Sequence, residues 1–169
     1  MDIDIAACMT IVRPGAQSKC NANDYNQLSM LDGTVKPTLA ELEAAWPAVK
    51  AKEKNSTLNA SCDAAIAGGF TSTALGTAHT YSCGLNDQTQ LTAQAFDAYR
   101  NAATPLWTCW FTCKNLAGVK ARREHTSAQI LLVADAGKLH VATQLSNRDT
   151  KVTLVNAALT VEQINAVTW

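Results

Sequence analysis

Three copies of the pattern T-x-x-E/Q fix where helices begin in this chain of 169 residues. In this capping box the threonine hydroxyl accepts a hydrogen bond from the backbone of the third helical residue, whose side chain bonds back to the threonine N–H. The three pairs are Thr38 with Glu41, Thr126 with Gln129, and Thr160 with Gln163. Each precedes apolar residues at helical spacing, so helices are expected to begin near residues 39, 127 and 161.

Other signals predict two more helices and several helix ends. Residues 3–12 have helical spacing and stop before Pro14, and residues 91–99 repeat the same spacing after a cap at Asn86 or Asp87. Pro47 is expected to kink or end the helix that begins at Leu39. Gly68-Gly69 is expected to stop this helix, and Gly137 is expected to end or loosen the helix that follows Thr126.

Strand signals lie between these helices. Residues 70–75 and 79–83 are rich in threonine and aromatic residues around a glycine turn, which predicts a hairpin. Residues 107–113, "WTCWFTC", alternate apolar and polar side chains, which predicts a half-buried strand, and a partner strand is expected over 119–124. A shorter strand is expected in "YNQLSMLDG", before the Asp32-Gly33 turn.

Together these elements predict an α+β fold, with a small antiparallel β-sheet and packed helices preceded by a short N-terminal helix-strand-helix region. A charged and polar stretch, "KAKEKNS" at residues 50–56, marks the expected boundary. The predicted organisation is an N-terminal leader region over 1–55 and an α+β domain over 56–169.

Charge and hydropathy exclude two classes of partner. Lysine plus arginine and aspartate plus glutamate number 14 each, so the chain has no net field that would attract nucleic acid or an anionic membrane. The one basic cluster, at Lys120, Arg122 and Arg123, is short for phosphate binding. The apolar run at 5–12 is too short to span a membrane and follows acidic residues, unlike a signal peptide. We therefore expect no nucleic-acid or membrane partner, and a cytosolic location when the chain is made.

The histidine and cysteine residues are candidates for a metal or catalytic site. Cys109 and Cys113, with His125 and Cys83 nearby, are the best candidate ligands, but residues four apart on a strand lie ~13 Å apart, too far for one zinc ion. The same distance separates His79 from Cys83. No G-x-S-x-G, G-x-x-x-x-G-K or H-E-x-x-H pattern is present.

The resulting prediction is a protein without a catalytic residue, metal or cofactor. We expect His79 and His125 to be structural, His140 to lie at the surface, and the six cysteines to be mostly reduced, buried thiols.

Aromatic side chains are the candidate partner-binding residues. Trp110 points away from the apolar face of its expected strand, which favours a protein contact. The alternative is that Trp110 packs under a helix on the second face of the sheet. The predicted partner-binding residues are Trp110, Tyr81 and Trp169.

The order of motifs resembles an uncharacterised domain of tail-fibre-associated and tail-fibre assembly proteins of tailed bacteriophages. The resemblance rests on "SCDAAIAGGFTSTALGTAHTYSCGLNDQTQL", a strand with tryptophan and cysteine, "REHTSAQILLVADAG" and "LTVEQINAVTW", and covers roughly residues 56–169. The front of the chain, from "MTIVRPGAQ" to "NDYNQLSMLDGTVKPTLAELEAAWP", is similar to the leader of small fibre-assembly proteins.

The resemblance implies a tail fibre assembly chaperone that binds a trimeric tail fibre protein in the host cytoplasm. The main alternative is a permanent structural or receptor-binding subunit of the fibre in the virion, and a remote one is a metal- or thiol-dependent enzyme. The resemblance supplies no catalytic residues.

Overall fold

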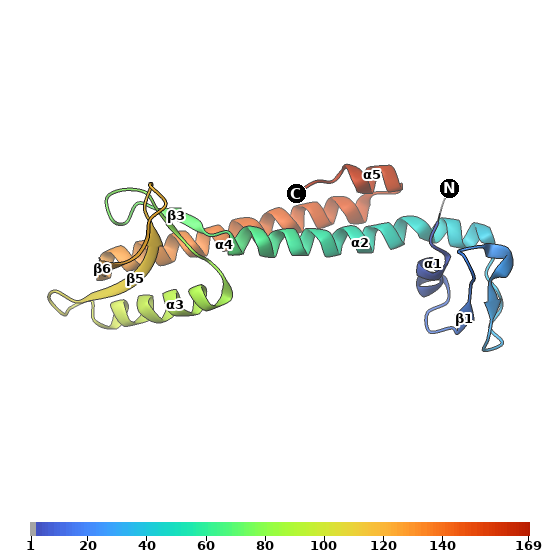
Figure 1. The fold of residues 1–169 in the computed structure, drawn as a ribbon, viewed down its shortest axis with the longest axis horizontal. Helices are drawn as coiled ribbons and strands as arrows, with labels where there is room; N and C mark the ends of the chain where they lie inside the picture. The colour runs from blue at the N-terminus through green and yellow to red at the C-terminus, as the bar shows by residue number, and fades with distance from the viewer. Residues whose placement is uncertain (1–2) are drawn as a thin grey trace. The chain divides into compact units, whose positions relative to one another are not determined.

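The computed structural model describes residues 3–169 and shows an α+β fold (Figure 1). Over this range the chain forms five α-helices, one 3-10 helix, a two-stranded antiparallel sheet and a four-stranded antiparallel sheet. The predicted fold class is therefore confirmed. The chain divides into two compact units, one made of the described residues up to Leu58 together with Thr150–Trp169, the other of Asn59–Asp149. The predicted division at residue 55 stays a prediction.

The first unit begins with α1 (Ile5–Val12), as the spacing of residues 3–12 predicts. Next come β1 (Ser18–Lys19), the 3-10 helix η1 (Tyr25–Gln27) and β2 (Ser29–Met30). The expected strand in "YNQLSMLDG" is thus reduced to the two residues of β2, which pair with β1. The side chain of Asp24 accepts from Asn26 N–H and starts the 3-10 turn, which takes the residues before β2 out of the strand.

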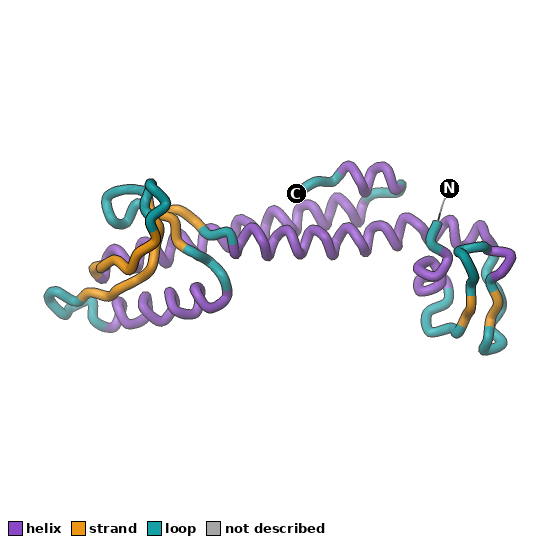
Figure 2. Tube along the Cα trace, in the orientation of Figure 1, coloured by secondary structure: helices purple, strands orange, loops and turns teal. Residues whose placement is uncertain are grey.

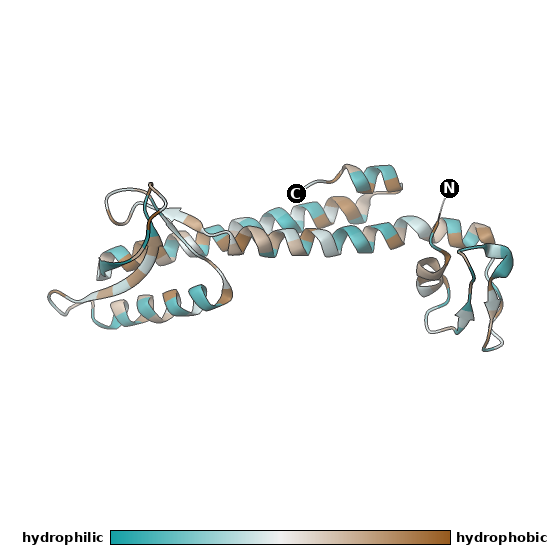
Figure 3. Ribbon diagram, in the orientation of Figure 1, coloured by the Kyte–Doolittle hydropathy of each residue, from teal (hydrophilic) through white to brown (hydrophobic). Residues whose placement is uncertain are grey.

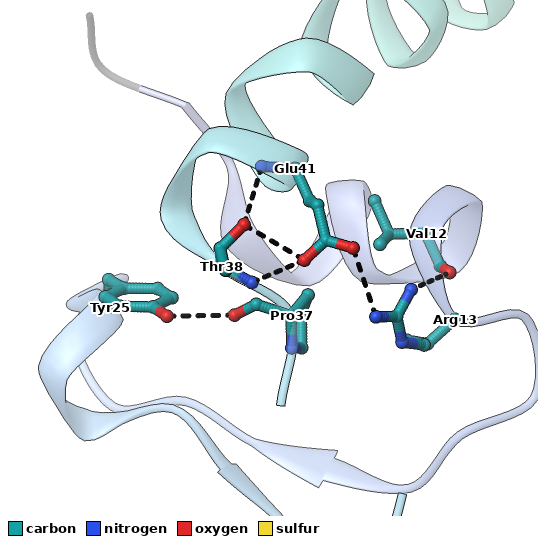
Figure 4. Close-up of polar contacts among 6 residues, drawn as sticks. All are labelled: Val12, Arg13, Tyr25, Pro37, Thr38 and Glu41. Atoms are coloured by element: carbon teal, nitrogen blue, oxygen red, sulfur yellow. Dashed lines mark hydrogen bonds and ion pairs between the residues drawn. The ribbon is translucent and has the colours of Figure 1, made fainter. Parts of the chain in front are cut away.

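The first capping box starts α2 (Leu39–Ala67) in the same unit (Figure 4). Thr38 N–H donates to Glu41 Oε2 (2.7 Å), and Glu41 N–H donates to Thr38 Oγ1 (3.2 Å). The other oxygen of Glu41 forms an ion pair with Arg13 at 3.2 Å, so the cap also ties α2 to the end of α1. Tyr25 OH donates to Pro37 O (2.9 Å) and fixes the chain just before the cap.

The other two boxes close with the same bonds. Thr126 and Gln129 begin α4 (Ser127–Ala157), and Thr160 and Gln163 begin α5 (Val161–Ala166). The predicted cap of α3 (Leu85–Arg100) is wrong by a few residues. This helix begins after Gly84, and Asp87 is its third residue, whose Oδ2 accepts from Gly84 N–H at 3.1 Å.

Neither Pro47 nor Gly137 ends its helix, because tertiary packing outweighs the local signal; the kink at Pro47 and the loosening at Gly137 stay predictions. The helix α2 continues through Pro47, where Leu42, Trp46 and Val49 are buried in the core of the first unit. The helix α4 continues through Gly137, which packs against Phe70: an alanine Cβ there would lie 2.9 Å from the Phe70 ring. Gly137 therefore allows a close approach and does not end the helix. The stop at Gly68-Gly69 is confirmed.

The second unit contains the four-stranded sheet in the order β3-β4-β5-β6. Its strands are β3 (Phe70–Ser72), β4 (His79–Tyr81), β5 (Thr108–Lys114) and β6 (Lys120–Thr126). All pairs are antiparallel, with Phe70 opposite Tyr81 and Cys109 opposite His125. The predicted hairpin, half-buried strand and partner strand are confirmed.

One face of this sheet carries the core of the second unit (Figures 1 and 2). Along β5, Cys109, Phe111 and Cys113 are buried and pack with residues of α3 and α4, among them Leu91 and Ile130. The alternate residues of β5 and β6 point to the opposite face, where most are exposed to solvent. Side chains alternate along a strand, so a sheet covered on one face shows this pattern.

None of the helices formed by residues 3–169 combines the length and apolar character needed to cross a membrane.

Candidate functional site

A buried polar pair lies at the centre of the second unit. Tyr81 on β4 and His125 on β6 are both fully buried, and Tyr81 Oη lies 2.9 Å from His125 Nε2. His125 Nδ1 lies 2.9 Å from Arg123 O. A carbonyl oxygen only accepts, so Nδ1 carries the proton, Nε2 accepts, and the Tyr81 hydroxyl donates. The pair thus satisfies both nitrogens of a histidine that has no access to water.

Burial keeps both groups neutral at physiological pH. It lowers the pKa of His125 below its ordinary value of 6.5, and the nearby His79 acts in the same direction. Burial, with Cys113 as a second cause, raises the pKa of Tyr81. Both side chains are fully buried, so the pair belongs to the core of the second unit. His79, which is also buried, belongs to the same inner face.

This arrangement predicts a specific dependence of stability on pH. The unfolded chain protonates His125 at about pH 6.5, whereas the folded chain resists protonation to lower pH. The contribution of His125 to the free energy of unfolding is therefore fully present well above pH 6.5 and is lost progressively as the pH falls through and below 6.5. Urea unfolding at a series of pH values, followed by circular dichroism, should show this decrease. A His125→Gln variant should lose most of it, and an unchanged slope in that variant would contradict this assignment.

Five of the six cysteine residues are buried. All six are free thiols, and burial raises the pKa of Cys8, Cys62, Cys83, Cys109 and Cys113. A raised pKa removes the thiolate that nucleophilic attack and metal binding require. Within residues 3–169, no three His, Cys, Asp or Glu side chains lie close enough together to hold a metal ion.

The burial of the thiols predicts how they react. Cys20 is half-buried, and the other five thiols are fully buried. In the folded protein, a small alkylating reagent is expected to modify Cys20 first, and the five others at least about 100-fold more slowly, because they react only after local opening. Mass spectrometry of the peptides at successive times measures the order, and fast labelling of Cys109 or Cys113 would contradict it.

The accessible site lies on the opposite side of the sheet. We call the exposed face of β5 and β6 the outer sheet face; its residues are Thr108, Trp110, Lys114, Lys120, Arg122 and Glu124. Trp110 is 55% exposed and lies opposite Glu124 on β6. Arg122 reaches across to Trp110 O (3.3 Å), and Thr108 Oγ1 donates to Glu124 Oε1 (2.8 Å). These bonds hold polar side chains around an exposed aromatic ring, an arrangement typical of interface centres.

The structure places the three predicted partner-binding residues in different environments. Trp110 and Trp169 are accessible, Trp169 being 40% exposed, but they belong to different units. Tyr81 is fully buried and bonded to His125, so it contacts no partner in this conformation and is assigned to the core. His140, expected at the surface, is half-buried, with Nε2 3.2 Å from Ala65 O near the end of α2. The carbonyls left unpaired at a helix end account for this placement.

Sequence reasoning missed an exposed apolar surface on α3. Leu91, Phe96 and Tyr99 recur at helical intervals, but Phe96 and Tyr99 are 63% and 73% exposed. Hydrophilic and hydrophobic residues are mixed along α3 (Figure 3). The residues of α3 that reach the core are Leu91 and Ala98, which are seven positions apart. Residues seven apart lie on the same face of a helix, so the spacing of Leu91 and Ala98 could have identified the buried face of α3.

An open groove of about 360 Å³ lies between α3 and α4. Its apolar lining includes Leu91, Ala134 and Val141, and the polar side chain of Gln88 also lines it. The groove and the outer sheet face are both accessible surfaces of the second unit.

The fold and these surfaces define the class of protein: an α+β protein with exposed aromatic side chains and a buried His–Tyr pair in its core. Residues 48–168 match the family described as "Domain of unknown function (DUF4376)", and the chain belongs to that family. No curated protein and no solved structure matches the chain.

Proposed function

We propose that this protein binds another protein chain and covers its surface during assembly, without catalysing a reaction. The observation that carries the proposal is the outer sheet face, where Trp110 is exposed although the opposite face of the same strand is fully packed. A large exposed aromatic residue costs solvation free energy, and burying it against a partner recovers that energy.

The proposed partner is a trimeric tail fibre protein of a tailed bacteriophage. This identity depends on the motif resemblance of residues 56–169, and the protein is proposed to act as an assembly chaperone in the host cytoplasm. A fibre of intertwined chains exposes strand edges and apolar surface until its three chains have paired. A chain with no net charge suits this role, because it would bind through packed contacts and not by general electrostatic attraction.

Co-expression tests the proposal. Soluble, trimeric fibre protein should increase at least several-fold when this chain is present. The variant Trp110→Ala should lower affinity for the fibre protein at least about tenfold, as a residue at the centre of an interface does. The matched control is Tyr99→Ala, an exposed aromatic residue of the same unit on α3. Equal fibre yield with and without this chain would contradict the proposal.

The permanent-subunit alternative is distinguished by mass spectrometry of purified virions. A chaperone that leaves after assembly is expected to be absent, whereas a structural or receptor-binding subunit is present at a fixed ratio to the fibre protein. The enzyme alternative requires turnover that disappears when His79 or His125 is replaced in a folded variant.

A further inference from the structure

The strand β6 ends the four-stranded sheet and leaves an open edge. It pairs with β5 on one side, and within residues 3–169 no strand lies on its other side. It has seven residues, whereas β3, at the opposite edge of the sheet, has three. An unpaired edge offers backbone N–H and C=O groups to an extended chain that lies alongside. The edge formed by β6 is therefore the longer of the two edges of this sheet.

The turn before β6 determines which of its residues offer these groups. Asn115 N–H donates to Val119 O (3.1 Å), so these two residues form a hydrogen-bonded pair. Bonded and non-bonded pairs alternate along an antiparallel ladder. The residues whose backbone bonds to β5 are therefore Ala121, Arg123 and His125. The residues whose backbone points away from β5 are Lys120, Arg122 and Glu124.

The charges along this edge are mainly positive. Lys120 and Arg122 extend their side chains on the outer sheet face, and Lys114 lies directly opposite Lys120 on β5. In the described part of the chain, no carboxylate forms an ion pair with these cations. The single acid, Glu124, already accepts a bond from Thr108. The charge of the edge is thus available to an acidic partner.

We propose that the edge of β6 binds an extended, acidic segment of the partner protein by strand addition. This inference rests on the proposed function and names the chemistry of the segment that would be covered. Two copies of this chain paired through β6 would bring the same cations together, so self-association at this edge is disfavoured. A polynucleotide is disfavoured because binding of phosphate chains recruits more cations than this edge offers.

The test uses the full chain and short peptides. The acidic probe is a nine-residue peptide that alternates glutamate with threonine or valine, and the control peptide has lysine in place of each glutamate. Calorimetry should show binding of the acidic peptide only. The charge-swap variant Lys120→Glu, Arg122→Glu should weaken that binding at least about tenfold and gain binding of the lysine peptide. The matched control variant, Lys19→Glu, Lys52→Glu, makes the same change in net charge at exposed positions on β1 and α2 and should bind as the wild type does.

Amide hydrogen exchange shows whether the backbone takes part. Strand addition should protect the amides of Arg122 and Glu124, while those of Arg123 and His125 stay as slow as in the free protein. Binding without this alternation, or equally tight binding of an oligo-dT strand, would overturn strand addition. Failure of the acidic peptide to bind would also overturn it. If the fibre protein were still captured in that case, the proposed function would stand and its contacts would lie elsewhere.

Discussion

Replacing Gly69 by alanine should destabilise the unit Asn59–Asp149 by about 3 kcal/mol or more. Gly69 has φ +90°, a conformation that costs an alanine about 1–2 kcal/mol. In addition, the alanine Cβ would overlap the carbonyl oxygen of Tyr81 and lie 3.2 Å from its carbonyl carbon. Because both atoms belong to the backbone of the neighbouring strand, no side-chain rotation relieves the contact. The β3–β4 pairing that holds Tyr81 in place is expected to be lost first.

Gly76 provides the matched control for this prediction. It has φ +85°, but an added Cβ meets no atom within 4 Å. Gly76→Ala should therefore show the conformational cost alone, about 1 kcal/mol. Urea unfolding followed by circular dichroism measures both variants. If Gly69→Ala were no less stable than Gly76→Ala, the close approach of Gly69 to β4 would be wrong.

Replacing His125 by alanine should destabilise the protein by about 3 kcal/mol or more. The change removes a buried ring and leaves the Tyr81 hydroxyl without its acceptor at 2.9 Å. Tyr81→Phe should cost less, about 1–3 kcal/mol, because the ring remains and only the bonds of the hydroxyl are lost, among them the one to His125 Nε2. Because both residues are fully buried, neither substitution should change the exposed residues of the protein.

A double-mutant cycle isolates the bond between the two side chains. If Tyr81 and His125 bond each other, the double variant should be more stable than the sum of the single effects predicts, with a coupling of about 0.5–3 kcal/mol. His140→Ala is the control, since this half-buried histidine bonds only backbone carbonyls near the end of α2. Simple additivity in the Tyr81–His125 cycle would contradict the buried bond.

The parts of the fold that sequence predicts well depend on neighbouring residues. The boxes at Thr38, Thr126 and Thr160 close between residues three apart, so the pattern contains both partners of each bond. The alternation of buried and exposed residues along β5 is also predictable, because successive side chains of one strand point to opposite faces of the sheet.

The parts that sequence does not predict depend on distant residues. Whether α2 continues through Pro47 depends on the burial of Trp46, and whether α4 continues through Gly137 depends on the Phe70 ring. The bond between Tyr81 and His125 joins residues 44 positions apart, so the residues next to either side chain do not predict it. For the candidate site, the pattern of β5 places Trp110 on the second face, but only the packing of α3 and α4 on the inner face leaves Trp110 exposed.

The central claim is that this protein acts by covering a partner's surface, and a direct binding measurement tests it. Purified chain and the purified tail fibre protein proposed as its partner are mixed, and the mass of the product is measured by light scattering during size-exclusion chromatography. The account predicts a complex of defined stoichiometry with wild-type protein, and a markedly weaker complex when Trp110→Ala is combined with Lys120→Glu and Arg122→Glu. Two separate peaks at high concentrations of both proteins would contradict it.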